Sequence, residues 1–168
     1  MIDWLQSFSH ATGIYAFMHS QWGWPLIESV HFTGLCLLIG SVGLFDLRML
    51  GLGRGIEMSA LHQLVPVGVA GFVLSALSGM MFLVTAPDQY LFNPAFRLKM
   101  LFMALAGVNM LVFYRFAAAR VYICPANSAA PRHAMTMAAV SLLCWTLIIV
   151  MGRLITYFRP PYHWCFFC

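Results

Sequence analysis

Glu28 and His31 lie three residues apart in the first long apolar stretch of the chain, which runs from Trp24-Pro25 past Cys36. On a helix this spacing places the two side chains side by side on one face. A carboxyl group within hydrocarbon costs at least about 2.5 kcal/mol, so such a residue normally has a partner and a role. A neutral imidazole can ligate iron or copper. The pair predicts a metal or haem site near one membrane face, with a purely structural fastening of helices as the open alternative.

Two further histidines, His62 and His133, begin the second and fourth apolar stretches, on the side opposite His31. A haem iron takes axial ligands from both faces of the porphyrin, and two imidazoles at similar depth on two helices meet this requirement. Interfacial histidines are also common as plain solvated residues, so both interpretations stay open. Within one chain, His31 is expected too far from His62 and His133 to share a haem with either of them. The second ligand of a haem at His31 is expected from a methionine, from His10 or His19, or from a second subunit.

Two arginines, Arg153 and Arg97, are expected on the same membrane side as Glu28. An ion pair between Glu28 and Arg153 is one explanation of these residues, because an unpaired charge should not face lipid. The other is that an arginine contacts the propionates of a haem whose iron is bound by His31, with Glu28 next to that ligand.

The C-terminal sequence His163-Trp-Cys165-Phe-Phe-Cys168 places one imidazole and two sulfur atoms within six residues. These donors suit Cu(I) or zinc, and the two cysteines suit a disulfide if their side of the membrane is oxidising. A copper-handling protein would use this cluster together with His10 or His19. Short C-x-x-C matches also arise by chance, and the twelve methionines are better explained as packing residues than as a copper pathway.

Other catalytic patterns find little support. The Glu-x-x-His spacing also occurs in carboxylate-bridged di-iron bundles, but those need further glutamates on facing helices. Glu57 is the only other glutamate in the sequence, and it is expected in a loop. The sequence contains no Gly-rich phosphate loop, HExxH or GxSxG motif, so hydrolase chemistry is not expected.

The elements that carry these residues follow from composition. With 62% hydrophobic and 8% charged residues, the chain departs too far from soluble domains to have water as its main solvent. Four stretches are long enough to cross a bilayer, at about 25–49, 60–86, 94–119 and 131–158. We therefore expect residues 1–168 to form one domain, an all-α integral membrane protein built as a four-transmembrane-helix bundle. Pro66 is expected to kink the second helix near its start.

Residues 3–20 alternate apolar and polar side chains at helical spacing, which predicts an amphipathic helix lying on the membrane surface. The segment lacks the basic start and continuous apolar centre of a secretory signal, so we expect it to be retained. Small residues on the first three spans, such as Gly34, Gly71 and Ser75, predict close helix contacts and a homo-oligomer.

The basic residues give a weak indication of orientation. Four are expected on the side of the termini, namely Arg97, Lys99, Arg153 and Arg159. Five are expected on the other side, namely Arg48, Arg54, Arg115, Arg120 and Arg132. The positive-inside rule then favours the bacterial inner membrane with both termini on the periplasmic side. These loop charges account for the pI near 9.0. We expect them to contact anionic lipid or haem propionates, and we expect no nucleic-acid partner.

The first span resembles a family of small bacterial membrane proteins that is known only as a domain of unknown function. The matching residues are Trp22, Trp24, Pro25, Glu28, His31, Phe32, Gly34, Leu37 and Gly40, followed by Asp46-Leu47-Arg48. The resemblance implies the four-span fold and a membrane location, and no activity. More loosely, four helices with histidines toward both faces are similar to the membrane cytochromes b, which place two histidines on each of two helices.

Three functions follow as hypotheses. The first is a protein that binds haem b at His31 and transfers electrons within the membrane, with a quinone or a cytochrome as redox partner. The second is a copper-binding protein that uses the C-terminal cluster. The third is a structural or assembly subunit in which the intramembrane polar residues only hold helices together.

Overall fold

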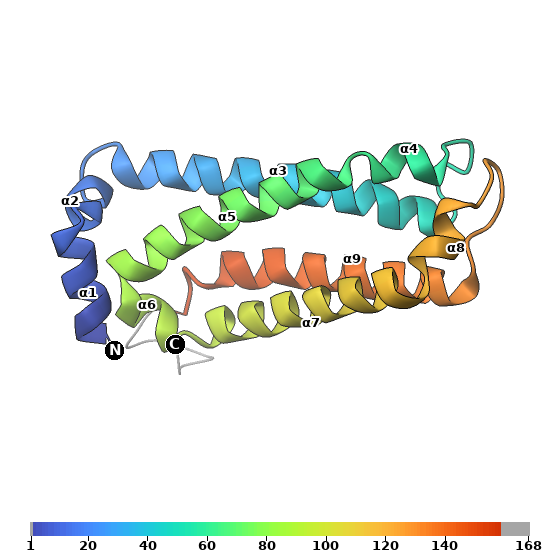
Figure 1. The fold of residues 1–168 in the computed structure, drawn as a ribbon. Helices are drawn as coiled ribbons and strands as arrows, with labels where there is room; N and C mark the ends of the chain where they lie inside the picture. The colour runs from blue at the N-terminus through green and yellow to red at the C-terminus, as the bar shows by residue number, and fades with distance from the viewer. Residues whose placement is uncertain (1, 159–168) are drawn as a thin grey trace.

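The computed structural model describes residues 2–158, and all regular secondary structure within them is helical. Four helical segments there are long and apolar enough to cross a membrane: Gly23–Met49, Met58–Thr85, Pro94–Phe116 and Arg132–Leu154. They run alongside one another in an elongated bundle (Figure 1). The predicted all-α class and the four membrane-spanning segments are thereby confirmed at the level of length and composition.

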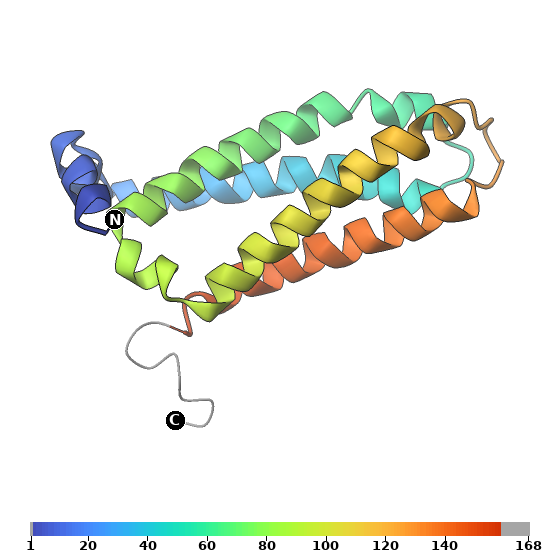
Figure 2. The ribbon, with the colours of Figure 1, turned by 60° about the horizontal axis from the view of Figure 1, so that its bottom comes forward.

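The long helices form two closely packed pairs. Helix α3 (Gly23–Met49) packs along α5 (Val65–Thr85), and α7 (Pro94–Phe116) packs along α9 (Arg132–Leu154). The two pairs meet mainly through α3 and α9, whereas α5 and α7 have little contact with each other (Figures 1 and 2). The interior of the bundle is therefore least covered along the seam between α5 and α7.

Glycine residues make the contact between α3 and α5 very close. A Cβ atom added to Gly34 would lie 2.7 Å from the carbonyl oxygen of Gly71, and one added to Gly71 would lie 2.6 Å from that of Gly34. Ser75, one turn after Gly71, donates its hydroxyl proton to the carbonyl oxygen of His31 at 3.2 Å. The small residues predicted to bring helices together do so at this crossing, which also carries His31.

The second span is interrupted near its start. Helix α4 (Met58–His62) ends before Gln63 and Leu64, and α5 then begins with Pro66 in its first turn. Proline lacks an N–H group, and its ring clashes with the carbonyl four residues earlier, here that of His62. The break lies where the sequence predicts a kink.

The third span ends earlier than the sequence predicts. Helix α7 ends at Phe116 rather than near residue 119, and the short helix α8 (Ala118–Tyr122) follows after Ala117. Between the second and third spans the chain turns through α6 (Pro87–Leu91).

Two short helices, α1 (Ile2–Ala11) and α2 (Ile14–Met18), precede the bundle in place of the single predicted helix over 3–20. Gly13 separates them with a φ of 75°, a left-handed conformation that glycine adopts without steric cost. Helix α1 crosses the end of the bundle and packs against α5 and α6 (Figure 1). Its amphipathic character and location on a membrane surface stay predictions.

Asn93 joins two elements at the end of the bundle where α1 lies (Figure 1). Its side-chain oxygen caps α7 by accepting hydrogen bonds from two N–H groups of the first turn, those of Ala95 and Phe96. Its amide nitrogen donates to the carbonyl oxygens of Ile155 and Phe158, both at 2.9 Å. The fully buried Asn93 thus joins the start of α7 to the chain that follows α9.

Arg48 fastens the opposite end. Its guanidinium group donates to the carbonyl oxygen of Ile56 at 2.7 Å and to that of Ser128 at 3.3 Å, and the side chain is 1% exposed. Because one carbonyl precedes α4 and the other precedes α9, Arg48 ties both loops to the end of α3.

Candidate functional site

His31 is half-buried on α3, and its ring faces α5. Its Nδ1 atom lies 2.9 Å from the hydroxyl oxygen of Ser78. That hydroxyl has a single proton, which it donates to the carbonyl oxygens of Leu74 at 2.8 Å and Ser75 at 3.1 Å. The Ser78 oxygen is left to accept, so the hydrogen-bond network assigns the proton of the imidazole to Nδ1. Nε2 then carries a lone pair and has no hydrogen-bond partner among residues 2–158.

The surroundings hold this ring in one orientation. Gly79 of α5 lies directly beside it, and a Cβ atom there would be 3.6 Å from His31 Cε1. Phe82 contacts the ring nearly edge-on, with ring centroids 5.9 Å apart and planes at 78°. A histidine that ligates a metal in proteins commonly donates its other ring N–H to a neighbouring oxygen, which fixes the tautomer. His31 and Ser78 have this arrangement.

A cavity of about 210 Å³ opens beside His31. His31 and Lys99 are the only basic side chains among the described residues that line it, and the rest of the wall is predominantly apolar. Lys99 is half-buried on α7, close enough to His31 for their charges to interact, and its ammonium group lies near Gly152 of α9. No hydrogen bond or ion pair joins Lys99 to residues 2–158. Among residues 2–158, the cavity wall therefore carries an imidazole whose Nε2 has no hydrogen-bond partner and a lysine amine without an ion pair.

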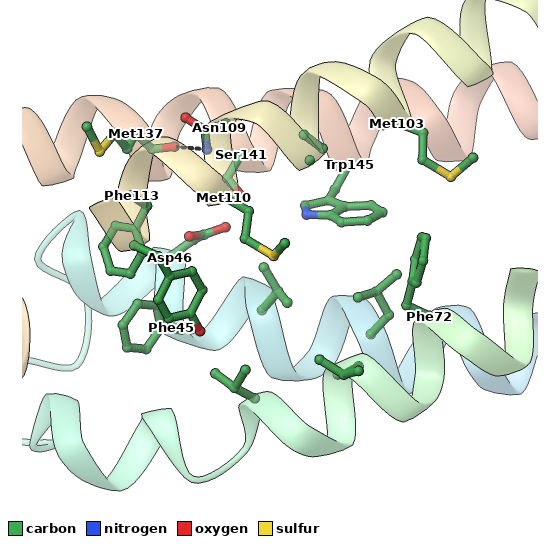
Figure 3. A pocket seen from close by; sticks show the side chains of 18 of the residues that line it. Phe45, Asp46, Phe72, Met103, Asn109, Met110, Phe113, Met137, Ser141 and Trp145 are labelled. Atoms are coloured by element: carbon green, nitrogen blue, oxygen red, sulfur yellow. Dashed lines mark hydrogen bonds between the residues drawn. The ribbon is translucent and has the colours of Figure 1, made fainter. Parts of the chain in front are cut away.

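A second cavity of about 290 Å³ continues along the bundle (Figure 3). The two cavities share four wall residues, Leu38, Phe72, Met103 and Trp145. Both lie along the seam between α5 and α7, where those helices have little contact. The second cavity contains Asp46, which is 3% exposed. Together they form an apolar interior with a basic group at one end and an acidic group at the other.

Glu28 does not take part in this interior. It is exposed on α3 and lines neither cavity, whereas Asp46, which shares its helical face, is buried. Arg153 is exposed and lies over the ring of Tyr157, with its guanidinium carbon 5.7 Å from the ring centroid. Within residues 2–158 no ion pair joins Glu28 to Arg153, so the predicted fastening by this pair is not observed. Arg97 is exposed too, and its Nε donates to the carbonyl oxygen of Leu91 at 3.0 Å.

His62 lies in an aromatic cluster at the far end of the bundle. Its ring is 4.3 Å from that of Tyr122, and Phe45 and Tyr114 contact it at longer distances. Burial raises the pKa of the Tyr122 phenol well above its usual value, and the neighbouring Tyr114 hydroxyl raises it further, so Tyr122 is a neutral phenol at physiological pH. His133 is exposed in the first turn of α9 and has no ring contact with His62. The structure does not bring these two histidines together.

The two histidines of the N-terminal helices lie on either side of one tyrosine. His10 and His19 both stack on Tyr15, with ring centroids 4.0 and 3.9 Å away. Because the phenol ring separates them, they do not converge on one metal ion. The predicted donors His163, Cys165 and Cys168 lie outside the described residues, and within 2–158 no group of three or more His, Cys, Asp or Glu side chains is arranged to hold a metal ion.

Lys99 and Ser78 are the site residues that sequence analysis missed. Lys99 was expected only as a basic residue of the membrane surface, although Phe96 and Met103, three residues before and four after it, mark a shared helical face. Ser78 is a small residue of the second span, and its sequence position alone predicts only close helix packing. A comparison of the chain with family models, curated proteins and solved structures found no match.

Proposed function

We propose that this protein binds haem b beside His31 and passes electrons within the membrane. The observation that carries the proposal is the fixed His31 ring, whose Nδ1 proton is held by Ser78 and whose Nε2 has no partner among the described residues. A lone pair on Nε2 is what an axial iron ligand must present. If the hydrogen bond from His31 served only to hold α3 against α5, there would be no need for a cavity beside the ring.

The cavity walls fit a flat, mainly apolar group. The cavity beside His31 has a volume of about 210 Å³, and it lies along the seam between α5 and α7, so part of a flat group can extend beyond it. Phe72, Phe96 and Trp145 supply aromatic faces to the wall of this cavity. The open seam between α5 and α7 allows a large planar group to enter from the side.

Three methionines line the same cavity, Met80, Met100 and Met103. If haem is bound, a thioether of one of these methionines would be a suitable second iron ligand beside His31. The second ligand could otherwise come from a neighbouring copy of the chain, which accords with the proposed homo-oligomer. Of the second ligands that sequence analysis leaves open, the methionines are the ones that line the cavity beside His31.

The chain's own residues then have distinct roles. Haem, when bound, supplies a reversible one-electron couple. His31 holds the iron through Nε2, and Ser78 keeps the imidazole in the required tautomer. Lys99 supplies the positive charge that propionate groups require in a medium of low dielectric, a role that sequence analysis gave to Arg97 or Arg153. The apolar walls exclude water from the site.

Location and partners follow the same proposal. We place the protein in a bacterial inner membrane with both termini periplasmic, so that the His31 end of the bundle is near the periplasmic face. The redox partner is then a membrane quinone or a cytochrome at that face. The loose similarity to membrane cytochromes b accords with this function, although the histidine pattern differs.

An absorption spectrum tests the proposal. Full-length protein purified in detergent from cells supplied with haem should show a b-type band on reduction with dithionite. His31→Ala should lose most of the bound haem, and the matched control His133→Ala, in an exposed position, should keep it. A colourless wild-type protein that also fails to take up added haem would contradict the proposal. Equal haem content in wild type and His31→Ala would contradict the role of His31.

A further inference from the structure

Asp46 is a buried acid without a visible counter-charge. Its side chain is 3% exposed, and its Oδ2 atom has no hydrogen-bond partner in the part of the chain that the structure describes. Arg48 is near in sequence, but its guanidinium group donates to two loop carbonyls, those of Ile56 and Ser128. No ion pair reaches Asp46 within residues 2–158. An unpaired acid within a helix that can span a membrane normally marks a functional site.

The Asp46 side chain lies in the wall of the larger cavity (Figure 3). It is the only acidic or basic side chain among the described residues that line this cavity. Ser141 of α9 lies next to it, and the Asn109 amide is already engaged with the carbonyl oxygen of Met137 at 3.0 Å. The cavity thus offers one carboxyl group in predominantly apolar surroundings.

Aromatic rings form much of the remaining wall. They come from all four long helices: Phe45 from α3, Phe72 from α5, Phe113 and Tyr114 from α7, and Trp145 from α9. The face of an aromatic ring attracts an organic cation, and the attraction is stronger when the cation is desolvated. A carboxyl group surrounded by such rings is complementary to a cation with apolar substituents, whereas an anion would be repelled.

The wall of the cavity includes residues on the outer surface of the bundle. Val69 of α5 and Met110 of α7 belong to its wall and are 54% and 51% exposed. These residues border the seam where α5 and α7 have little contact. A ligand dissolved in the bilayer can therefore reach Asp46 from the side, without passing through the loops.

We propose that this cavity binds lipophilic organic cations of the substituted-ammonium class, taken up from the membrane, with the Asp46 carboxylate as their counter-ion. The volume of about 290 Å³ accommodates a small alkyl or aryl ammonium ion. The proposal is independent of haem, because it rests on the acidic end of the interior and not on His31.

Binding of benzyltrimethylammonium to the full-length protein in detergent micelles tests this proposal, measured by titration calorimetry. Wild type should bind it saturably at one site per chain. Asp46→Asn, which preserves shape and removes the charge, should weaken binding at least tenfold. The control Asp88→Asn changes an exposed acid of α6 and should leave the affinity unchanged. The anionic counterpart benzylsulfonate should not bind.

A second measurement uses wild-type protein and does not depend on the folding of a variant. Dicyclohexylcarbodiimide modifies carboxyl groups in apolar surroundings, and mass spectrometry of peptides locates the adduct. Benzyltrimethylammonium should protect Asp46 from modification in a concentration-dependent way, whereas benzylsulfonate should not. Absence of saturable binding by wild type, equal affinity of Asp46→Asn, or equal modification of Asp46 with and without the cation would each overturn the proposal.

Discussion

Replacing Gly34 with alanine places a methyl group between α3 and α5 where the structure has no room for it. The new Cβ atom would lie 2.5 Å from the Ser75 hydroxyl oxygen, 2.7 Å from the Gly71 carbonyl oxygen and 2.9 Å from the Ser75 nitrogen. Two of these three neighbours are backbone atoms, which cannot turn aside as a flexible side chain does. The helices themselves must separate.

The magnitude follows from these distances. Restoring an ordinary 3.4 Å contact with the Gly71 oxygen moves the two helices apart by roughly 0.7 Å. The hydrogen bond from Ser75 to the carbonyl oxygen of His31, now 3.2 Å long, would then exceed hydrogen-bonding distance. Overpacking costs about 1–3 kcal/mol and a lost hydrogen bond about 0.5–1.5 kcal/mol. We expect Gly34→Ala to lower the free energy of unfolding by about 2–4 kcal/mol.

Unfolding in mixed micelles with increasing fractions of a denaturing detergent measures this quantity. Gly40→Ala is the matched control, because the same substitution on the same helix meets no atom within 4 Å. It should change stability by less than about 0.5 kcal/mol, or raise it slightly through the higher helix propensity of alanine. If Gly34→Ala and Gly40→Ala were equally stable, the close α3–α5 crossing would be wrong.

Three further substitutions test the polar contacts. Asn93→Ala removes the cap of α7 and two hydrogen bonds to Ile155 and Phe158, so it should cost about 2–4 kcal/mol in the same unfolding assay, and a loss below about 1 kcal/mol would contradict these contacts. Arg48→Lys cannot reproduce both guanidinium bonds, so limited proteolysis should cut the loops at 50–57 and 123–131 faster than in wild type, and unchanged cleavage rates would show that these bonds do not hold the loops. Ser9→Ala removes a buried hydroxyl that has no partner among the described residues, and thermal unfolding should show unchanged or slightly higher stability rather than a loss.

Much of the fold was predictable, because the composition leaves a helical membrane bundle as the reasonable form of this chain. Length and apolar content locate the four spans, and the chemistry of proline locates the break before Pro66. The division of the N-terminal segment at Gly13 was not predicted, because apolar periodicity continues on both sides of that glycine.

The candidate site was only partly predictable. Helical periodicity places Glu28 and Asp46 on one face of α3, but it does not say which part of that face a neighbouring helix covers, and only Asp46 is buried. His31 was found from its residue type and depth. The contributions of Ser78 and Lys99 depend on which helices pair and on where they cross, and a single sequence does not contain that information.

The axial role of His31 is the central claim, and restoration of the ligand tests it most directly. His31→Ala removes the imidazole and leaves space for a free one beside Ser78 and Gly79. We predict that apoprotein carrying this substitution takes up little haem in a titration followed by absorption, and that millimolar imidazole restores the uptake and the absorption spectrum of the wild-type protein. Uptake equal to wild type without imidazole, or no response to imidazole, would contradict ligation by His31.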